Sequence, residues 1–173
     1  MQRTTLILII ILLVKFVSFG QDNNKPISKL EFHSVSFSIL DFYITNKTGG
    51  VSFKADVSFD KDVHIIKFQA LTSVEYQIFA SYLEIISELN LYYGREFSLN
   101  NWLYYDIYGG LGFFKINNLY NINNNKSTTI GFPIQNRLRL QTKKKFGGGF
   151  QFQVNLNTLR IVYSPGFFLQ WTF

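Results

Sequence analysis

From about residue 29 to its last residue, the chain alternates between apolar and polar side chains with a period of two. The clearest early case runs from Val51 to Phe59, where Val, Phe, Ala, Val and Phe are separated by Ser, Lys, Asp and Ser. Successive side chains of a strand point to opposite faces, so this pattern predicts strands with one apolar and one polar face. The fold class that we expect is therefore all-β.

Turn-forming clusters divide the alternating chain into eight segments. We predict strands over residues 29–45, 51–59, 64–78, 82–97, 102–116, 128–142, 146–157 and 159–173. Residues 71–91 also fit an amphipathic helix, although the period of two holds on both sides of Ala80. In the first segment the apolar positions change parity, which requires a β-bulge. Those positions are Leu30, Phe32, Val35, Phe37 and Ile39.

The first twenty residues have the pattern of a secretory signal peptide. Arg3 gives a positive start, Leu6 to Val14 form an apolar run, and Ser18 to Gly20 supply the small residues of a cleavage site before Gln21. A membrane-spanning helix is the alternative, but it needs about 20 apolar residues, and the run up to Phe19 is shorter and contains Lys15. We therefore expect residues 1–20 to be removed on export.

Composition excludes several classes of function. The chain has no Cys, so a disulfide scaffold, a thiolate metal site and a Cys nucleophile are ruled out. The formal net charge of +6 is small and scattered, and no phosphate-binding loop is present, so we expect no nucleic-acid partner and no cofactor.

Two closed architectures fit eight alternating strands: a soluble lipid-carrier barrel with apolar residues inside, and an outer-membrane barrel with apolar residues outside. The last three predicted strands alone place 16 large apolar side chains on one face. An eight-stranded barrel is just wide enough for its own side chains or one small ligand, so these would overfill it. We therefore predict an eight-stranded antiparallel up-and-down transmembrane β-barrel over residues 29–173, preceded by a short segment, 21–28.

The last residues of the chain resemble the end of a known class of protein. Leu169, Trp171 and Phe173 alternate up to a final aromatic residue, and in this the chain resembles bacterial outer-membrane β-barrels, whose last strand ends in Phe and is recognised by the barrel assembly machinery. The family pattern also has a Gly five residues before that Phe, where this chain has Phe168, with Gly166 two residues earlier.

Four internal segments are similar to small, uncharacterised outer-membrane barrels of Bacteroidota: residues 91–97, 102–112, 130–134 and 146–149. The resemblance implies a fold and a compartment, the outer membrane of a Gram-negative bacterium, and no agreed activity.

Both ends of such a barrel face the periplasm, so the Asn-rich connection from Asn117 to Ser127 should be extracellular. Aromatic residues near the two membrane interfaces are expected to form girdles; the candidates are Trp102, Tyr104, Tyr105, Tyr163 and Trp171. Tyr104 has the parity of the lumen, so an ordinary strand position is the alternative for it.

Charged residues on the polar parity predict the contents of the lumen. Arg on the lipid side at mid-bilayer costs about 2–4 kcal/mol, so Arg137, Arg139 and Arg160 should point inward. Buried charges must be paired, which predicts a polar network that plugs the lumen. Its members would be Glu84, Glu88, Asp106, Arg137 and Arg139. A loose, hydrated set of polar side chains is the alternative.

The two histidines, His33 and His64, are the only candidates for acid–base catalysis. A hydrolase would need one of them beside Ser and a carboxylate, and no third partner is evident, so we expect no catalytic or metal site.

We expect a non-enzymatic outer-membrane barrel with a structural or interaction role. Its partners would be outer-membrane lipid, the assembly machinery and a protein that contacts the extracellular loops. The alternatives are an accessory barrel of a secretion or uptake complex and a lipid-modifying barrel enzyme.

Overall fold

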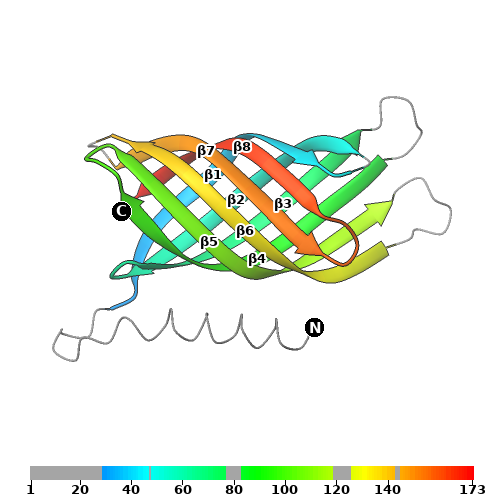
Figure 1. The fold of residues 1–173 in the computed structure, drawn as a ribbon, viewed down its shortest axis with the longest axis horizontal. Coiled ribbons are helices and arrows are strands. Elements are labelled where there is room, and N and C mark those ends of the chain that lie inside the picture. The colour runs from blue at the N-terminus through cyan, green and yellow to red at the C-terminus, as the bar shows by residue number, and fades with distance from the viewer. Residues whose placement is uncertain (1–28, 47, 77–82, 119–125, 143–144) are drawn as a thin grey trace, which may run out of the picture.

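A computed structural model describes residues 29–46, 48–76, 83–118, 126–142 and 145–173 (Figure 1). The described chain forms eight strands. They are β1 (Glu31–Ile44), β2 (Gly49–Lys61), β3 (His64–Tyr76), β4 (Leu83–Ser98), β5 (Leu103–Asn118), β6 (Lys126–Gln141), β7 (Phe146–Asn157) and β8 (Val162–Thr172). No helix among the described residues is long and apolar enough to cross a membrane.

Each strand pairs antiparallel with the next, and β1 pairs with β8, so the sheet closes into a barrel in chain order. The predicted fold class is thus confirmed as an eight-stranded antiparallel barrel of the outer-membrane type. The strand interpretation of residues 71–91 is confirmed where the structure describes them, since β3 continues to Tyr76 and β4 starts at Leu83. Residues 77–82 lie outside the described part.

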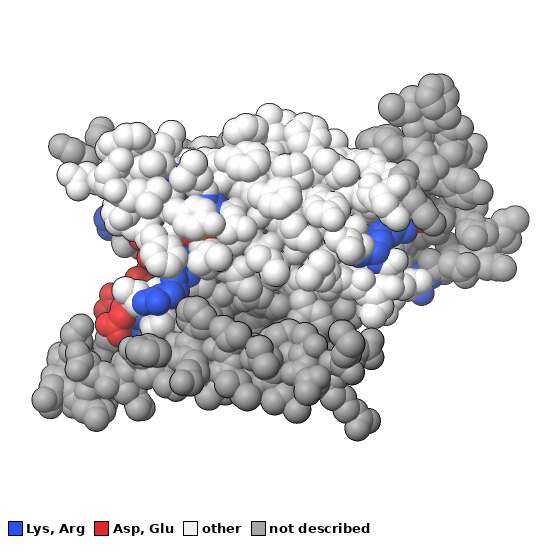
Figure 2. Space-filling model, in the orientation of Figure 1, with Lys and Arg blue, Asp and Glu red and all other residues white. Residues whose placement is uncertain are grey.

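The apolar parity points out of the barrel. Phe53, Leu89 and Phe113 are each more than 60% exposed, while the residues that alternate with them are buried. Figure 2 shows the result: uncharged residues cover the middle of the barrel, and the charged residues in this view lie toward its two ends. The wide apolar belt with a polar interior is the arrangement of a membrane barrel, and not of a lipid-carrier barrel.

The predicted bulge is present in β1, and a second irregularity follows it. The register against β2 shifts between Phe32 and Ser34 and again between Phe37 and Asp41. The outward parity of Val35 and Phe37 was predicted from the sequence, and the second shift was not. The second shift moves the outward set to Leu40, Phe42 and Ile44, and it turns Asp41 into the lumen.

Short connections join the strands at the end of the barrel that carries residue 29 and Phe173 (Figure 1). Lys61 pairs with His64 across a two-residue turn in which Asp62 has φ 60°, and Lys145, beside the start of β7, has φ 66°. Asp tolerates this left-handed region better than most residues, as tight hairpins require. The wider sequence gaps, after Tyr76 and Asn118, are at the opposite rim. We call these the short-turn rim and the long-loop rim.

Candidate functional site

The lumen is the candidate site because it holds charged side chains that are almost completely removed from solvent. Among the described residues, eight ionisable Asp, Glu, Lys and Arg side chains are buried, four acidic and four basic. They are Asp41, Lys54, Asp56, Lys67, Glu88, Asp106, Arg137 and Arg139. Their formal charges cancel, which a buried set requires because an uncompensated ion in a low-dielectric interior is costly.

Arg137 of β6 lies at the centre of this set. Its guanidinium forms a two-pronged ion pair with Asp56 of β2, on the other side of the barrel. It also donates to Ser36 Oγ at 3.2 Å and to Gln151 Oε1 at 3.1 Å. The ring of Phe168 lies 4.5 Å from the guanidinium carbon. Fork-like pairing of Arg with a carboxylate fixes both partners in orientation as well as in position, so this contact ties β2 to β6 through the lumen.

A second ion pair joins the first two strands. Lys54 Nζ lies 2.8 Å from Asp41 Oδ2, and Gln151 donates to both carboxylate oxygens of Asp41 at 3.2 Å. Gly166 of β8 leaves the space for Asp41, since a Cβ built on Gly166 would lie 1.4 Å from Asp41 Oδ1. The bulge in β1 and a glycine in β8 therefore both serve to place this carboxylate.

Among the described residues, no carboxylate forms an ion pair with Lys67. Its ammonium donates to Gln135 Oε1 and lies 3.4 Å from the ring centre of Tyr108 and 4.7 Å from that of Tyr92. Gly94 makes room for the Tyr108 ring, because a Cβ there would lie 2.1 Å from it. Aromatic faces attract cations most strongly when water is excluded, so the rings of Tyr92 and Tyr108 stabilise the Lys67 ammonium in place of a carboxylate.

Glu88 is held by amides instead of by a cation. Its Oε2 accepts hydrogen bonds from Asn155 at 2.9 Å, Asn90 at 3.0 Å and Gln153 at 3.3 Å. Gly112 and Gly131 face Asn90 and Asn155 at distances that no Cβ could take. Glu88 thus belongs to a cluster of amides, and no ion pair among the described residues joins it to the predicted arginines.

Toward the short-turn rim the lumen ends in a charged cluster. Arg139 forms an ion pair with Glu96, and its Nη1 lies 3.8 Å from Asp106 Oδ2. His33 bridges Asp60 (Nδ1, 3.3 Å) and Glu96 (Nε2, 3.6 Å). The Tyr104 ring lies 5.0 Å from the Arg139 guanidinium, in agreement with its lumen parity.

The long-loop rim differs, because an apolar cluster lies in the lumen there. Its members are Tyr43, Ile86, Phe114, Ile116 and Val162. Beyond this cluster Arg160 pairs with Glu84 at 3.0 Å, and both side chains are 21% exposed. The predicted polar network does not include this level, where apolar side chains such as Ile86 and Phe114 lie on the polar parity of β4 and β5.

The structure places the five predicted network residues at different positions along the lumen. Arg139 lies close to Asp106. Arg137 is opposite Asp106 in the β5–β6 register, but its ion pair is with Asp56. Glu84 and Glu88 contact neither arginine in the interactions described above. The principal partners that the sequence analysis omitted are Asp41, Lys54, Asp56, Lys67, Glu96 and the glutamines of β6 and β7.

The described contacts of the two histidines are with carboxylates and a tyrosine, and no Ser hydroxyl of the described residues is hydrogen-bonded to either ring. Ser34, next to His33, hydrogen-bonds Ser58 at 2.6 Å. His64 is on the outward parity at the short-turn rim, where its Nδ1 and Tyr93 Oη are 2.5 Å apart and the rings are stacked. Within the described ranges, no group of three His, Asp or Glu side chains is arranged to hold a metal ion.

The end of the chain contacts β1 through outward side chains as well as through backbone pairing. Leu169, Trp171 and Phe173 are all exposed on the outward face. The backbone amide of Phe173 donates to the carbonyl of His33 at 3.0 Å, and its ring lies 4.9 Å from that of Phe32 across the β1–β8 seam.

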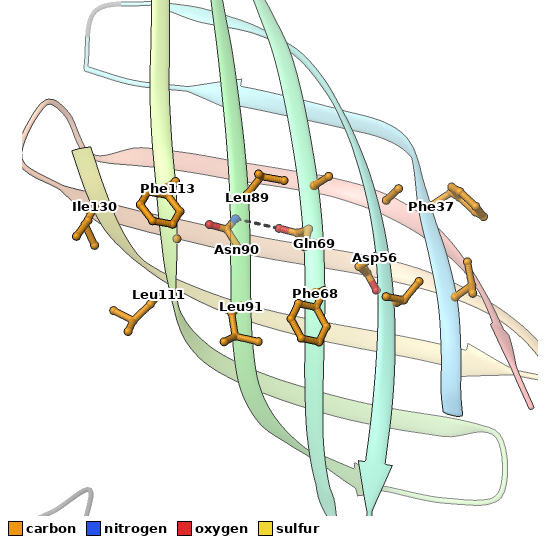
Figure 3. Close-up of a pocket in the computed structure, with 15 residues that line it drawn as sticks. Phe37, Asp56, Phe68, Gln69, Leu89, Asn90, Leu91, Leu111, Phe113 and Ile130 are labelled. Carbon is orange, nitrogen blue, oxygen red and sulfur yellow. Dashed lines mark hydrogen bonds between the residues drawn. The ribbon is translucent and has the colours of Figure 1, made fainter. Parts of the chain in front are cut away.

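A hollow on the barrel is on the lipid side and not in the lumen (Figure 3). Its apolar lining comes from the outward parity of β1 to β6, with Ala55 opposite Ala70 between the larger Phe37 and Leu89. At the same level, Asn90 donates to Gln69 at 3.3 Å on the inward parity. The polar residues of its lining, Asp56, Gln69 and Asn90, are on the inward parity.

No protein-family model matches the chain, and no curated protein matches its sequence. Solved structures do match its fold. Neisserial surface protein A (NspA) aligns with a TM-score of 0.67 at 8% identity, over 82% of this chain and 97% of that one. The N-terminal β-barrel domain of Pseudomonas aeruginosa OprF aligns at 0.62 and 10% identity, over 84% and 100%. The outer-membrane enzyme PagL aligns at 0.51 and 12% identity, over 81% and 99%. At these identities the likeness is one of fold.

Proposed function

We propose that this chain is a non-enzymatic barrel of the bacterial outer membrane, with a structural or interaction role and a lumen closed to solutes. The observation that carries the proposal is the combination of an apolar outer belt with a charge-balanced, side-chain-filled interior. Such a barrel gains stability in lipid and presents its connections on the membrane surface, while the interior leaves no path for solutes.

Export and assembly belong to the same proposal. Residues 1–20 would direct export and be cleaved, and Leu169, Trp171 and Phe173 would be recognised by the barrel assembly machinery. These three side chains lie on one face of the last strand and are exposed there.

The enzyme alternative finds less support. A lipid-modifying barrel would need His beside Ser and a carboxylate at the outer lipid surface, and both histidines of this chain lie toward the short-turn rim, which faces the periplasm in this proposal. PagL shares the fold and is an enzyme, so the fold alone does not decide between the two functions.

The test begins with the full chain expressed in a Gram-negative host. Membranes are fractionated, and the outer-membrane fraction is run unheated and boiled in SDS. A band that shifts on boiling, together with no conductance steps in a planar bilayer, is the expected result. Recovery as a soluble periplasmic protein would refute the location, and steady ion conductance would refute the closed lumen. Crosslinking to a secretion or uptake complex would favour the accessory-subunit role.

A further inference from the structure

A block of polar side chains interrupts the apolar belt at the long-loop rim. On the outward faces of β5 and β6, Lys115 is opposite Thr128, and Asn117 is opposite Lys126. We call these four residues the rim block. Lys115, Lys126 and Thr128 are exposed, and Asn117 is half-buried with its Oδ1 atom shielded from solvent and without a hydrogen-bond partner among the described residues.

Apolar residues occupy outward positions near this rim in three other strand pairs. Phe42 is opposite Val51 in β1–β2, Val74 is opposite Ile85 in β3–β4, and Val154 is opposite Tyr163 in β7–β8. Ile85 is also the direct neighbour of Asn117 in the β4–β5 register, so the row that contains Asn117 and Lys126 continues as apolar residues on β4 and β3. The row that contains Lys115 and Thr128 instead continues as the exposed polar residues Ser87 on β4 and Thr72 on β3. The two lysines therefore distinguish the rim block from its neighbours on this rim.

The residues below the rim block return to the apolar belt at once. Phe113 is opposite Ile130, and these side chains are 65% and 57% exposed. Lys115 and Lys126 are diagonal neighbours, which places their Cβ atoms roughly 7–8 Å apart. Two flexible ammonium groups at that spacing can both reach one phosphate group, with the Thr128 hydroxyl between them as a further donor.

We propose that the rim block binds the phosphate group of a phosphate-bearing lipid in the outer leaflet, with the acyl chains of that lipid along Phe113 and Ile130. Charge-assisted hydrogen bonds from the two lysines hold the phosphate, and the Thr128 hydroxyl adds a third donor. The apolar pair below supplies the matching surface for acyl chains, so the four polar and two apolar residues together fit one amphipathic lipid. The inference rests on the membrane orientation of the proposed function and does not depend on the closed lumen.

The experiment uses the protein purified from outer membranes in non-ionic detergent and measures lipid binding in mixed micelles by native mass spectrometry. The probes are diphosphoryl lipid A, its dephosphorylated form and inorganic phosphate. The test variant is K115Q/K126Q, with each single substitution alongside it. The matched control is K61Q/R95Q, which removes two positive charges from the outward parity at the short-turn rim. A band that shifts on boiling shows that each variant is folded, independently of binding.

We expect K115Q/K126Q to bind diphosphoryl lipid A at least tenfold more weakly, each single variant to lose part of that affinity, and K61Q/R95Q to stay within twofold of the parent. Equal affinity for the dephosphorylated lipid would overturn the proposal, as would an equal loss in the control variant. Inorganic phosphate that binds as tightly as the lipid would assign the block to a free anion and contradict the lipid. Failure of the parent protein to enter the outer membrane would instead count against the proposed function.

Discussion

Removing the Arg137 guanidinium should destabilise the barrel more than any exposed charge can. Arg137→Ala leaves Asp56 buried and uncompensated, and Asp56→Ala leaves Arg137 in the same state. Loss of one partner of a buried ion pair costs about 3–5 kcal/mol, a large part of the 5–15 kcal/mol that holds a typical domain folded. Because each variant removes the same interaction, the two effects should not add.

The assay is a double-mutant cycle by urea unfolding in detergent micelles, with the fluorescence of Trp102 and Trp171 as the signal. The double variant D56L/R137M replaces the ion pair by apolar side chains, and its free energy of unfolding should lie much closer to that of the parent than either single variant. Arg160→Gln is the control, since its partner Glu84 is part-exposed, and it should cost about 1 kcal/mol or less. The reasoning would be refuted if each single variant lost less than about 1 kcal/mol of unfolding free energy, or if the losses of the two single variants added up in the double variant.

Three further predictions follow from the packing. Gly166→Ala should displace Asp41 and break its contact with Lys54, lowering the free energy of unfolding by about 3 kcal/mol in the same urea assay, whereas Gly109→Ala, with nothing within 4 Å, should change it by less than about 0.5 kcal/mol. Phe32→Ala and Phe173→Ala should show a coupling energy of about 0.5–1.5 kcal/mol in a double-mutant cycle, because their rings meet across the seam; independent effects would contradict the contact. Gly94→Ala should push Tyr108 away from Lys67 and lower the temperature at which the unboiled band shifts; an unchanged temperature would show that the ring can move without cost.

The period of two was sufficient to predict the fold. All eight strands were expected at nearly their observed bounds, and the outward parity followed from volume, because the large side chains of β6 to β8 could not fit inside. The bulge near Ser34 was also visible as a change of parity. The second irregularity was not predicted, because Ile39 continues the apolar parity in sequence while the backbone shifts register to bring Asp41 inward.

The partners of each charge were harder to predict than the inward direction of the charges. Parity places Asp56 and Arg137 on the inner face, but β2 and β6 are far apart in the sheet, and only closure of the barrel brings them together. The partners of Lys67 and Glu88 were harder still to predict, because aromatic rings stabilise Lys67 and amides stabilise Glu88 in place of opposite charges. The apolar cluster that contains Tyr43 and Ile86 shows that the alternation predicts which face a side chain points to, and not whether that side chain is polar.

The central claim is that the apolar parity faces lipid, and the absence of Cys allows a direct measurement of it. Single-cysteine variants at Phe113 and Phe152, labelled with a fluorophore and reconstituted in vesicles, are titrated with lipids that carry a nitroxide quencher in mid-chain. We predict strong quenching at both positions, since both side chains project outward from the belt. A protein that stays soluble, with labels that the lipid nitroxide does not quench, would contradict the orientation of the barrel.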